Sequence, residues 1–190
     1  MTYTVSLSNA SAFDTKVYVA LSGDAIGGDD YTTSGLSSDA NGTYVLITAG
    51  NTSTTFTATS ELDNTYEGQE SVVATINTTT HRPATNGVTL STTTAAATGY
   101  IVDDGSANGS GGNYESDLPT VAIAVSPTKV SEGDTGGSGA TLTYTVSLSN
   151  ASAFDTKVYV ALTGSATGVT DYTTSGLSSD ANGTYVTIAA

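Results

Sequence analysis

The chain carries two copies of one long segment of its own sequence. Residues 2–49 return as residues 143–190, and only seven of the 48 paired positions differ. The period of 141 residues is the length of an ordinary single domain, and near-identity at a fixed period is the mark of a tandem array. The phase of the repeat predicts that the chain opens inside one unit and stops inside the next, as a window on a longer polymer. Any fold for this chain must therefore suit repeated units of one kind.

Composition favours strands over helices. Thr, Ser, Gly, Ala and Val dominate, while long helix-forming residues are scarce. Because β-branched side chains suit a pleated, half-buried surface, we expect an all-β protein. The chain has no cysteine, so disulfides do not hold the fold. Stability must come from core burial, sheet pairing or bound ions.

The chain is strongly acidic. Eighteen Asp and Glu residues oppose four Lys and Arg residues, which gives a formal net charge of −14. Such a charge repels nucleic acid and anionic membrane surfaces, so we expect neither as a partner. No apolar run approaches the roughly 20 residues that a membrane-spanning helix needs, so we expect no membrane insertion.

Apolar residues alternate with polar ones in several short segments. The pattern is clearest in residues 3–7 and 142–148, and it is typical of strands with one buried face. The strand before Pro127 is expected to kink there and to resume toward Val130, because proline lacks a ladder donor. Seven short strands per repeat predict a two-sheet antiparallel sandwich. The other expected strands cover residues 54–60, 72–77, 95–102, 120–125, 158–162 and 185–188.

The repeat phase also predicts the domain boundaries. Residues 1–104 should form one repeat that lacks its first strand, and residues 118–190 the truncated first part of the next. Residues 105–117 are rich in Gly and Ser and are expected to be a flexible linker, since their composition cannot bury a core. Residues 81–91 contain a proline and an Asn-Gly turn signal and are expected to form a long hairpin excursion.

Five motifs occur in a fixed order when one repeat is read from residue 118 to 190 and then from 50 to 117. They are KVSEGD, LTYTVSLSN, TDY (GDDY in the other copy), YEGQESV and GYIVDDG. In this order the motifs resemble the Calx-β repeat family, and the resemblance covers essentially the whole 141-residue unit. The resemblance implies an immunoglobulin-like sandwich, a fold found in sodium–calcium exchangers, integrin subunits and giant bacterial surface proteins.

Some members of this family bind calcium through carboxylates at one end of the sandwich. The resemblance therefore implies Ca²⁺ as the cofactor. One departure from the family pattern concerns the two adjacent Asp residues of many calcium-binding members, because here Leu62 precedes Asp63. The candidate metal ligands implied by the matched motifs are Asp30, Asp63, Glu67, Glu70, Asp103, Asp104, Glu132 and Asp171.

The chemistry of these residues agrees with calcium but leaves a second interpretation open. Ca²⁺ takes six to eight oxygen ligands, and carboxylates from several loops supply them while the ion offsets their mutual repulsion. The alternative is that the acidic residues are solvated turn residues, as Asp commonly is beside Gly.

No enzyme is expected. His81 is the only histidine, and the chain has no nucleophile-elbow motif of the Gly-x-Ser-x-Gly type. Glu67 and Glu70 are paired carboxylates, but the chain has no tryptophan on which a sugar substrate would stack.

Two functions remain as hypotheses. The first is a structural and adhesive module: a calcium-stiffened repeat of a very long extracellular or cell-surface protein, of bacterial type. The second is a calcium-dependent recognition domain whose loops, residues 81–91 above all, bind a carbohydrate or protein partner.

The phase of the repeat also predicts assembly. Residues 118–140 should supply the first strand that residues 1–104 lack, either by folding back within one chain or by completing a neighbouring copy. Neighbouring repeats or copies of the chain are then its partners, in a head-to-tail filament. Residues 143–190 should compete with residues 2–49 for the same place.

Overall fold

The computed structural model describes residues 1–77, 95–102, 118–132 and 139–190. Strands are the regular structure of this described part, and it contains no helix, as predicted. It divides into two compact units. The first comprises Met1–Asp63 and Gly68–Val102, and the second comprises Asn64–Glu67 with the described residues from 118 to 190.

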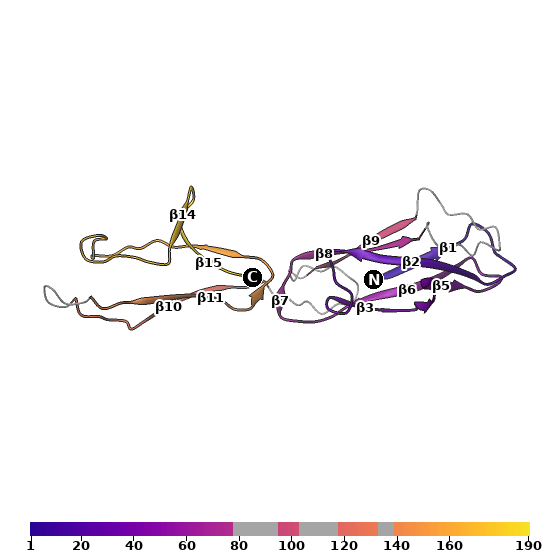
Figure 1. Ribbon diagram of the computed structural model, residues 1–190, viewed down its shortest axis with the longest axis horizontal. Helices are drawn as coiled ribbons and strands as arrows, with labels where there is room; N and C mark the ends of the chain where they lie inside the picture. The colour runs from indigo at the N-terminus through magenta and orange to yellow at the C-terminus, as the bar shows by residue number, and fades with distance from the viewer. Residues whose placement is uncertain (78–94, 103–117, 133–138) are drawn as a thin grey trace. The chain divides into compact units, whose positions relative to one another are not determined.

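The first unit consists of two antiparallel sheets (Figure 1). One sheet has the strand order β1-β6-β3, and the other has the order β4-β5-β2-β8-β9. The long strand β2 serves two partners, since its first half pairs with β5 and its second half with β8. The strands are β1 (Thr2–Ser6), β2 (Thr15–Gly23), β3 (Tyr31–Ser34), β4 (Ser37–Asp39), β5 (Gly42–Ile47), β6 (Ser53–Ser60), β8 (Gln69–Ile76) and β9 (Ala96–Val102).

Side chains from both sheets form one apolar core. Alternation along each strand places every second residue on the buried face, as the burial pattern of β1 shows. The core is therefore the interior of a two-sheet arrangement consistent with a β-sandwich. Its buried members are Tyr3, Val5, Val17, Val19, Ala25, Tyr31, Val45, Ile47, Phe56, Ala58, Val72 and Ala74.

Tyr3 links the two sheets directly. Its ring stacks on Phe56 with 4.9 Å between centroids, and its hydroxyl donates a 2.7 Å hydrogen bond to the carbonyl oxygen of Val72. Burial raises the pKa of the Tyr3 hydroxyl, because the phenolate would lose its hydration. Gly99 of β9 lies close to the hydroxyl: a Cβ there would be only 3.0 Å from the Tyr3 oxygen. The glycine of the GYIVDDG motif thus has a packing reason.

The second unit has less buried structure. Its sheets are the antiparallel pair β10-β11, the antiparallel set β13-β15-β14, and a short parallel pair β12-β7. Most of its strand residues are exposed or half-buried. Its strands are β7 (Thr65–Tyr66), β10 (Val121–Ser126), β11 (Thr143–Leu148), β12 (Ala151–Ser152), β13 (Thr156–Tyr159), β14 (Ser178–Asp180) and β15 (Gly183–Ile188).

One sequence prediction about β10 requires correction. This strand ends at Ser126, where the Ser126-Pro127 peptide is cis, and no strand resumes toward Val130. β10 pairs with β11 of its own repeat, with Val121 opposite Leu148. Proline has no N–H to donate to a ladder, so Pro127 favours the end of the strand at Ser126.

Two segments singled out in the sequence lie outside the described residues. They are the expected excursion, residues 81–91, and the expected linker, residues 105–117. Within the described part, no helix has the length and apolar character needed to cross a membrane.

Candidate metal centre

Asp30 is held in place immediately before β3. Its side chain is buried, and one carboxylate oxygen accepts a hydrogen bond from the backbone N–H of Ile26. Its own backbone N–H donates to the carbonyl of Ile26 at 2.8 Å, and its carbonyl accepts from Glu61 at 2.8 Å. The loop therefore fixes the orientation of the Asp30 carboxylate and leaves its second oxygen for another partner.

Glu67 and Glu70 come from the YEGQESV motif on either side of a tight turn. Gly68 between them has φ of +79°, a left-handed conformation that glycine adopts without steric cost. Glu70 lies in β8 opposite Ile101, and both glutamates are half-buried. The turn thus places two carboxylates close together at the start of a strand.

The three carboxylates meet. Asp30, Glu67 and Glu70 each offer one ligand oxygen, and these oxygens all lie within 4.8 Å of one another. Like charges at such a separation repel each other, and the repulsion grows where burial lowers the effective dielectric constant. A cation would offset this repulsion, and three carboxylate oxygens are the donors that hard divalent cations prefer. The cluster therefore has the composition of a metal site.

The other predicted ligands are placed differently. Asp63, Glu132 and Asp171 are exposed, and none joins an acidic group of three within the described part of the chain. Asp103 and Asp104 lie outside the described residues. The structure thus brings together three of the eight predicted ligands.

Asp171 is the counterpart of Asp30 in the second repeat, and its loop has the same local geometry. Its carboxylate accepts a 2.6 Å hydrogen bond from the N–H of Thr167, and its own N–H donates to the Thr167 carbonyl at 2.8 Å. The acidic residue before Tyr therefore orders this turn in both copies. Only in the first copy do two glutamates lie beside it among the described residues.

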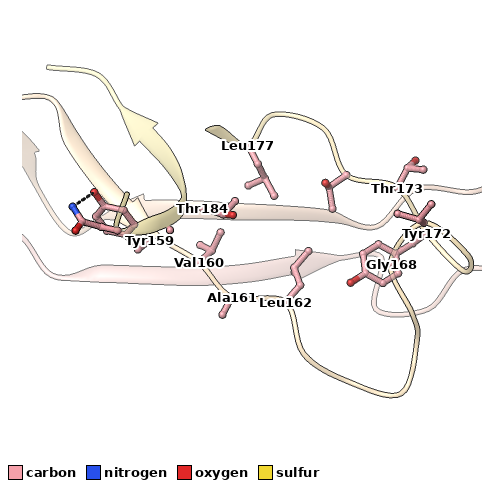
Figure 2. Close-up of a pocket in the computed structure, with 13 residues that line it drawn as sticks. Tyr159, Val160, Ala161, Leu162, Gly168, Tyr172, Thr173, Leu177 and Thr184 are labelled. Carbon is pink, nitrogen blue, oxygen red and sulfur yellow. Dashed lines mark hydrogen bonds between the residues drawn. The ribbon is translucent and has the colours of Figure 1, made fainter. Parts of the chain in front are cut away.

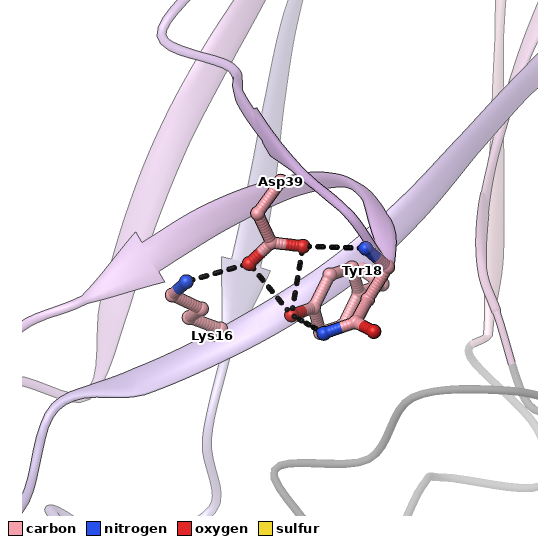
Figure 3. Close-up of polar contacts among 4 residues, drawn as sticks. Lys16, Tyr18 and Asp39 are labelled. Atoms are coloured by element: carbon pink, nitrogen blue, oxygen red, sulfur yellow. Dashed lines mark hydrogen bonds and ion pairs between the residues drawn. The ribbon is translucent and has the colours of Figure 1, made fainter.

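A polar cluster at the β4–β5 turn was missed by the sequence analysis (Figure 3). Asp39 accepts hydrogen bonds from the ammonium of Lys16 at 2.7 Å and from the hydroxyl of Tyr18 at 3.1 Å. It also accepts from the backbone N–H of Asn41 at 2.9 Å, and Lys16 lies 4.2 Å from the ring centroid of Tyr44. Lys16 and Tyr18 are two positions apart in a strand and so lie on one face, and this spacing could have indicated the cluster.

The same cluster occurs in the second repeat. Lys157 and Tyr159 donate to Asp180 at 3.0 and 2.9 Å, and Lys157 lies 4.3 Å from the ring centroid of Tyr185. In the first copy, the hydrogen bond between Lys16 and Asp39 raises the pKa of the ammonium and lowers the pKa of the carboxyl. The cluster closes a turn in each copy.

A hollow in the second unit is lined in part by residues whose counterparts are buried in the first unit (Figure 2). Two of its lining residues, Val160 and Tyr172, correspond to Val19 and Tyr31 of the first repeat. Val19 and Tyr31 belong to the buried core of the first unit. In that core they pack together with residues of β6 and β8. Its apolar lining includes Tyr159, Val160, Leu162, Val169, Tyr172 and Leu177.

No protein-family model, curated protein or solved structure matches this chain. The Calx-β resemblance therefore stays a prediction from the motifs.

Proposed function

We propose that this chain is a structural and adhesive repeat module of a large extracellular or cell-surface protein, stabilised by Ca²⁺. The observation that carries the proposal is the convergence of Asp30, Glu67 and Glu70. These residues come from two of the motifs that resemble the Calx-β family. A module of this kind resists extension through its sheets and gains rigidity when an ion ties its loops together.

The donor set suits calcium better than softer metals. All three groups are carboxylates, and hard oxygen donors favour Ca²⁺ and Mg²⁺ over metals that prefer imidazole or thiolate. One oxygen of Asp30 is already bonded to Ile26, so three monodentate oxygens leave part of a calcium shell to backbone carbonyls and water. A shell of that size is more readily completed around the larger, geometrically tolerant Ca²⁺ than around Mg²⁺.

The immunoglobulin-like fold is part of the same proposal. Two facing antiparallel sheets of three and five strands support it, as does a core drawn from both sheets. Tandem modules of this fold, repeated every 141 residues, would form the stalk or fibre of a surface protein.

Thermal unfolding of the full chain tests the calcium claim. With millimolar Ca²⁺ the melting temperature should rise relative to the same protein in chelator, because an ion that binds only the folded state stabilises it by mass action. At a concentration of 100 Kd the stabilisation is about 2.7 kcal/mol. A parallel titration with Mg²⁺ should give a smaller rise.

The repeat supplies a matched pair of variants for this test. Asp30→Asn keeps an oxygen that can accept from Ile26 but removes a charge from the cluster, so the calcium-induced rise should fall sharply. Asp171→Asn makes the same change in a loop without the two glutamates and should keep the full rise. Equal rises in wild type and Asp30→Asn would contradict the assignment of the ion to this cluster. Calcium-dependent retention of the chain on a glycan array would favour the recognition hypothesis instead.

A further inference from the structure

The strand sequence TYTVSL occurs twice, and its two copies pair with different neighbours. Residues 2–7 include β1, which pairs with β6. Residues 143–148 form β11, which pairs with β10. One strand sequence is therefore seen with two partners.

The hydrogen bonds show which edge of β1 is used. Leu7 donates its N–H to Thr52 at 2.7 Å, and Ala58 donates its N–H to Met1 at 3.0 Å. Successive residues of a strand direct their backbone groups to opposite edges. The backbone groups on the β6 edge are thus those of Met1, Tyr3, Val5 and Leu7, and those on the other edge belong to Thr2, Thr4, Ser6 and Ser8.

In the second repeat the opposite edge is occupied. Ser149 donates its N–H to Thr120 at 2.9 Å, and Ser149 is the counterpart of Ser8. By the same alternation, the backbone groups of Thr143, Thr145 and Ser147 lie on the edge that pairs with β10. On β11, β10 therefore occupies the edge that no described strand occupies on β1.

We propose that this edge of β1 binds the β10 segment of a second copy of the chain. The register follows from the β10–β11 pairing, shifted by one repeat. Val125 would lie opposite Tyr3, Ile123 opposite Val5, and Val121 opposite Leu7. The inference shares its partner with the assembly expected of a stalk module, but it requires no metal ion, so the two proposals can fail separately.

Burial favours the place on β1 over the place on β11. Beside β11, the side chains of Val121 and Ile123 are 51% and 61% exposed. Beside β1, the same side chains would lie on the face that carries Tyr3 and Val5, which belong to the complete core of the first unit. The backbone pattern is identical at both places, so the additional apolar burial favours the place on β1, whereas the covalent connection along the chain favours the place on β11. Neither strand carries a charged residue, so the high net charge does not oppose the contact locally.

Proline substitution on the full chain tests the edge. Thr4→Pro removes an N–H from the edge that no described strand occupies and none of the bonds to β6, and proline is tolerated where its missing donor is not needed by a ladder. Thr145→Pro makes the same change in β11, where it removes a bond to β10 and frees that strand. Sedimentation velocity over a range of concentrations, in Ca²⁺ and in chelator, should show wild-type dimers and larger species in both. Thr4→Pro should remain monomeric, and Thr145→Pro should assemble at lower concentration than wild type.

A peptide measurement covers the case in which Thr4→Pro fails to fold. Unlabelled peptide of residues 118–130 in excess should dissolve wild-type assemblies and slow amide exchange at Thr4 and Ser6, whereas a scrambled peptide should do neither. A folded Thr4→Pro chain that assembles as wild type does would overturn the proposal. So would a wild-type chain that stays monomeric, or a peptide that leaves the exchange of Thr4 and Ser6 unchanged.

Discussion

Residues 2–49 and 143–190 have almost the same sequence and form the same turns, but they differ in burial. Tyr3 is 7% exposed and its counterpart Tyr144 is 53% exposed, while Tyr31 and Tyr172 are 5% and 37% exposed. The clusters around Asp39 and Asp180 are nevertheless alike. Local structure in this protein thus depends on neighbours within the segment, whereas burial depends on strands outside it.

Strand length follows the same rule. β2 covers nine residues and β13 only four, although residues 15–21 and 156–162 are identical. The second half of β2 pairs with β8, and the described part of the second repeat contains no strand of this kind. An extended segment becomes a strand only where a ladder partner satisfies its backbone groups.

The largest expected difference in stability between the two copies comes from truncating the equivalent tyrosines Tyr3 and Tyr144. Tyr3→Ala removes a buried ring stacked on Phe56 and should lower the free energy of unfolding by about 3–5 kcal/mol. Tyr144→Ala changes an exposed ring and should cost no more than about 0.5 kcal/mol. Urea unfolding followed by circular dichroism measures both. Similar losses for the two variants would mean that the copies have equivalent cores.

Alanine substitution of the equivalent glycines Gly23 and Gly164 should give a smaller difference in the free energy of unfolding. Gly23 and Gly164 both have positive φ, at +130° and +150°, so alanine strains either backbone by about 1–2 kcal/mol. A Cβ at Gly23 would collide with the carbonyl oxygen of Ser71 in β8, whereas a Cβ at Gly164 would meet nothing within 4 Å. Gly23→Ala should therefore cost a further 1–3 kcal/mol or so, in line with other overpacked sites. Chemical denaturation of both variants measures this difference, and its absence would rule out close β2–β8 contact at Gly23.

The smallest expected effect is one in which the two copies should agree. Hydrogen bonds hold the pKa of Asp39 and of Asp180 below the usual range of a carboxyl; the main donor is the Lys16 ammonium for Asp39 and the Asn182 backbone N–H for Asp180. A carboxyl with a lowered folded-state pKa contributes stability above its unfolded pKa, and this contribution is lost as the pH falls through the folded pKa. Asp39→Asn and Asp180→Asn should each slightly flatten the acid side of the stability curve.

Unfolding free energies measured from neutral to acidic pH check this sign. Lys16 has a raised pKa, so its contribution should persist until the pH rises above the usual lysine range. A variant with a steeper acid dependence than wild type would contradict the role given to Asp39.

Much of the fold was predictable because apolar and polar residues alternate along its strands. The segments around Phe56, Val73 and Tyr100 were expected as strands and are β6, β8 and β9. The strand β4 has the sequence Ser-Ser-Asp and no apolar residue, so no period could reveal it. Its place is set instead by pairing with β5 and by the bonds that Asp39 accepts.

The candidate site was predictable in its residue types but not in its membership. The motifs indicated eight acidic residues, and folding brings Asp30, Glu67 and Glu70 together while Asp63 lies exposed nearby in sequence. Whether a carboxylate faces its neighbours depends on the turn at Gly68 and on the register of β8, neither of which a motif specifies.

The sequence alone determined the repeat and the strand-rich composition, and the Asn-Gly pairs at Asn41-Gly42 and Asn182-Gly183 favour the turns found there. These features depend on residues close together in the chain. Only the tertiary structure decided which edge of the TYTVSL strand is used, which copy is buried and which carboxylates meet. Those outcomes depend on contacts such as the one between Tyr3 and Val72, which are 69 residues apart. Alternation shows that a strand has a buried face, but it does not specify the strand that will cover that face.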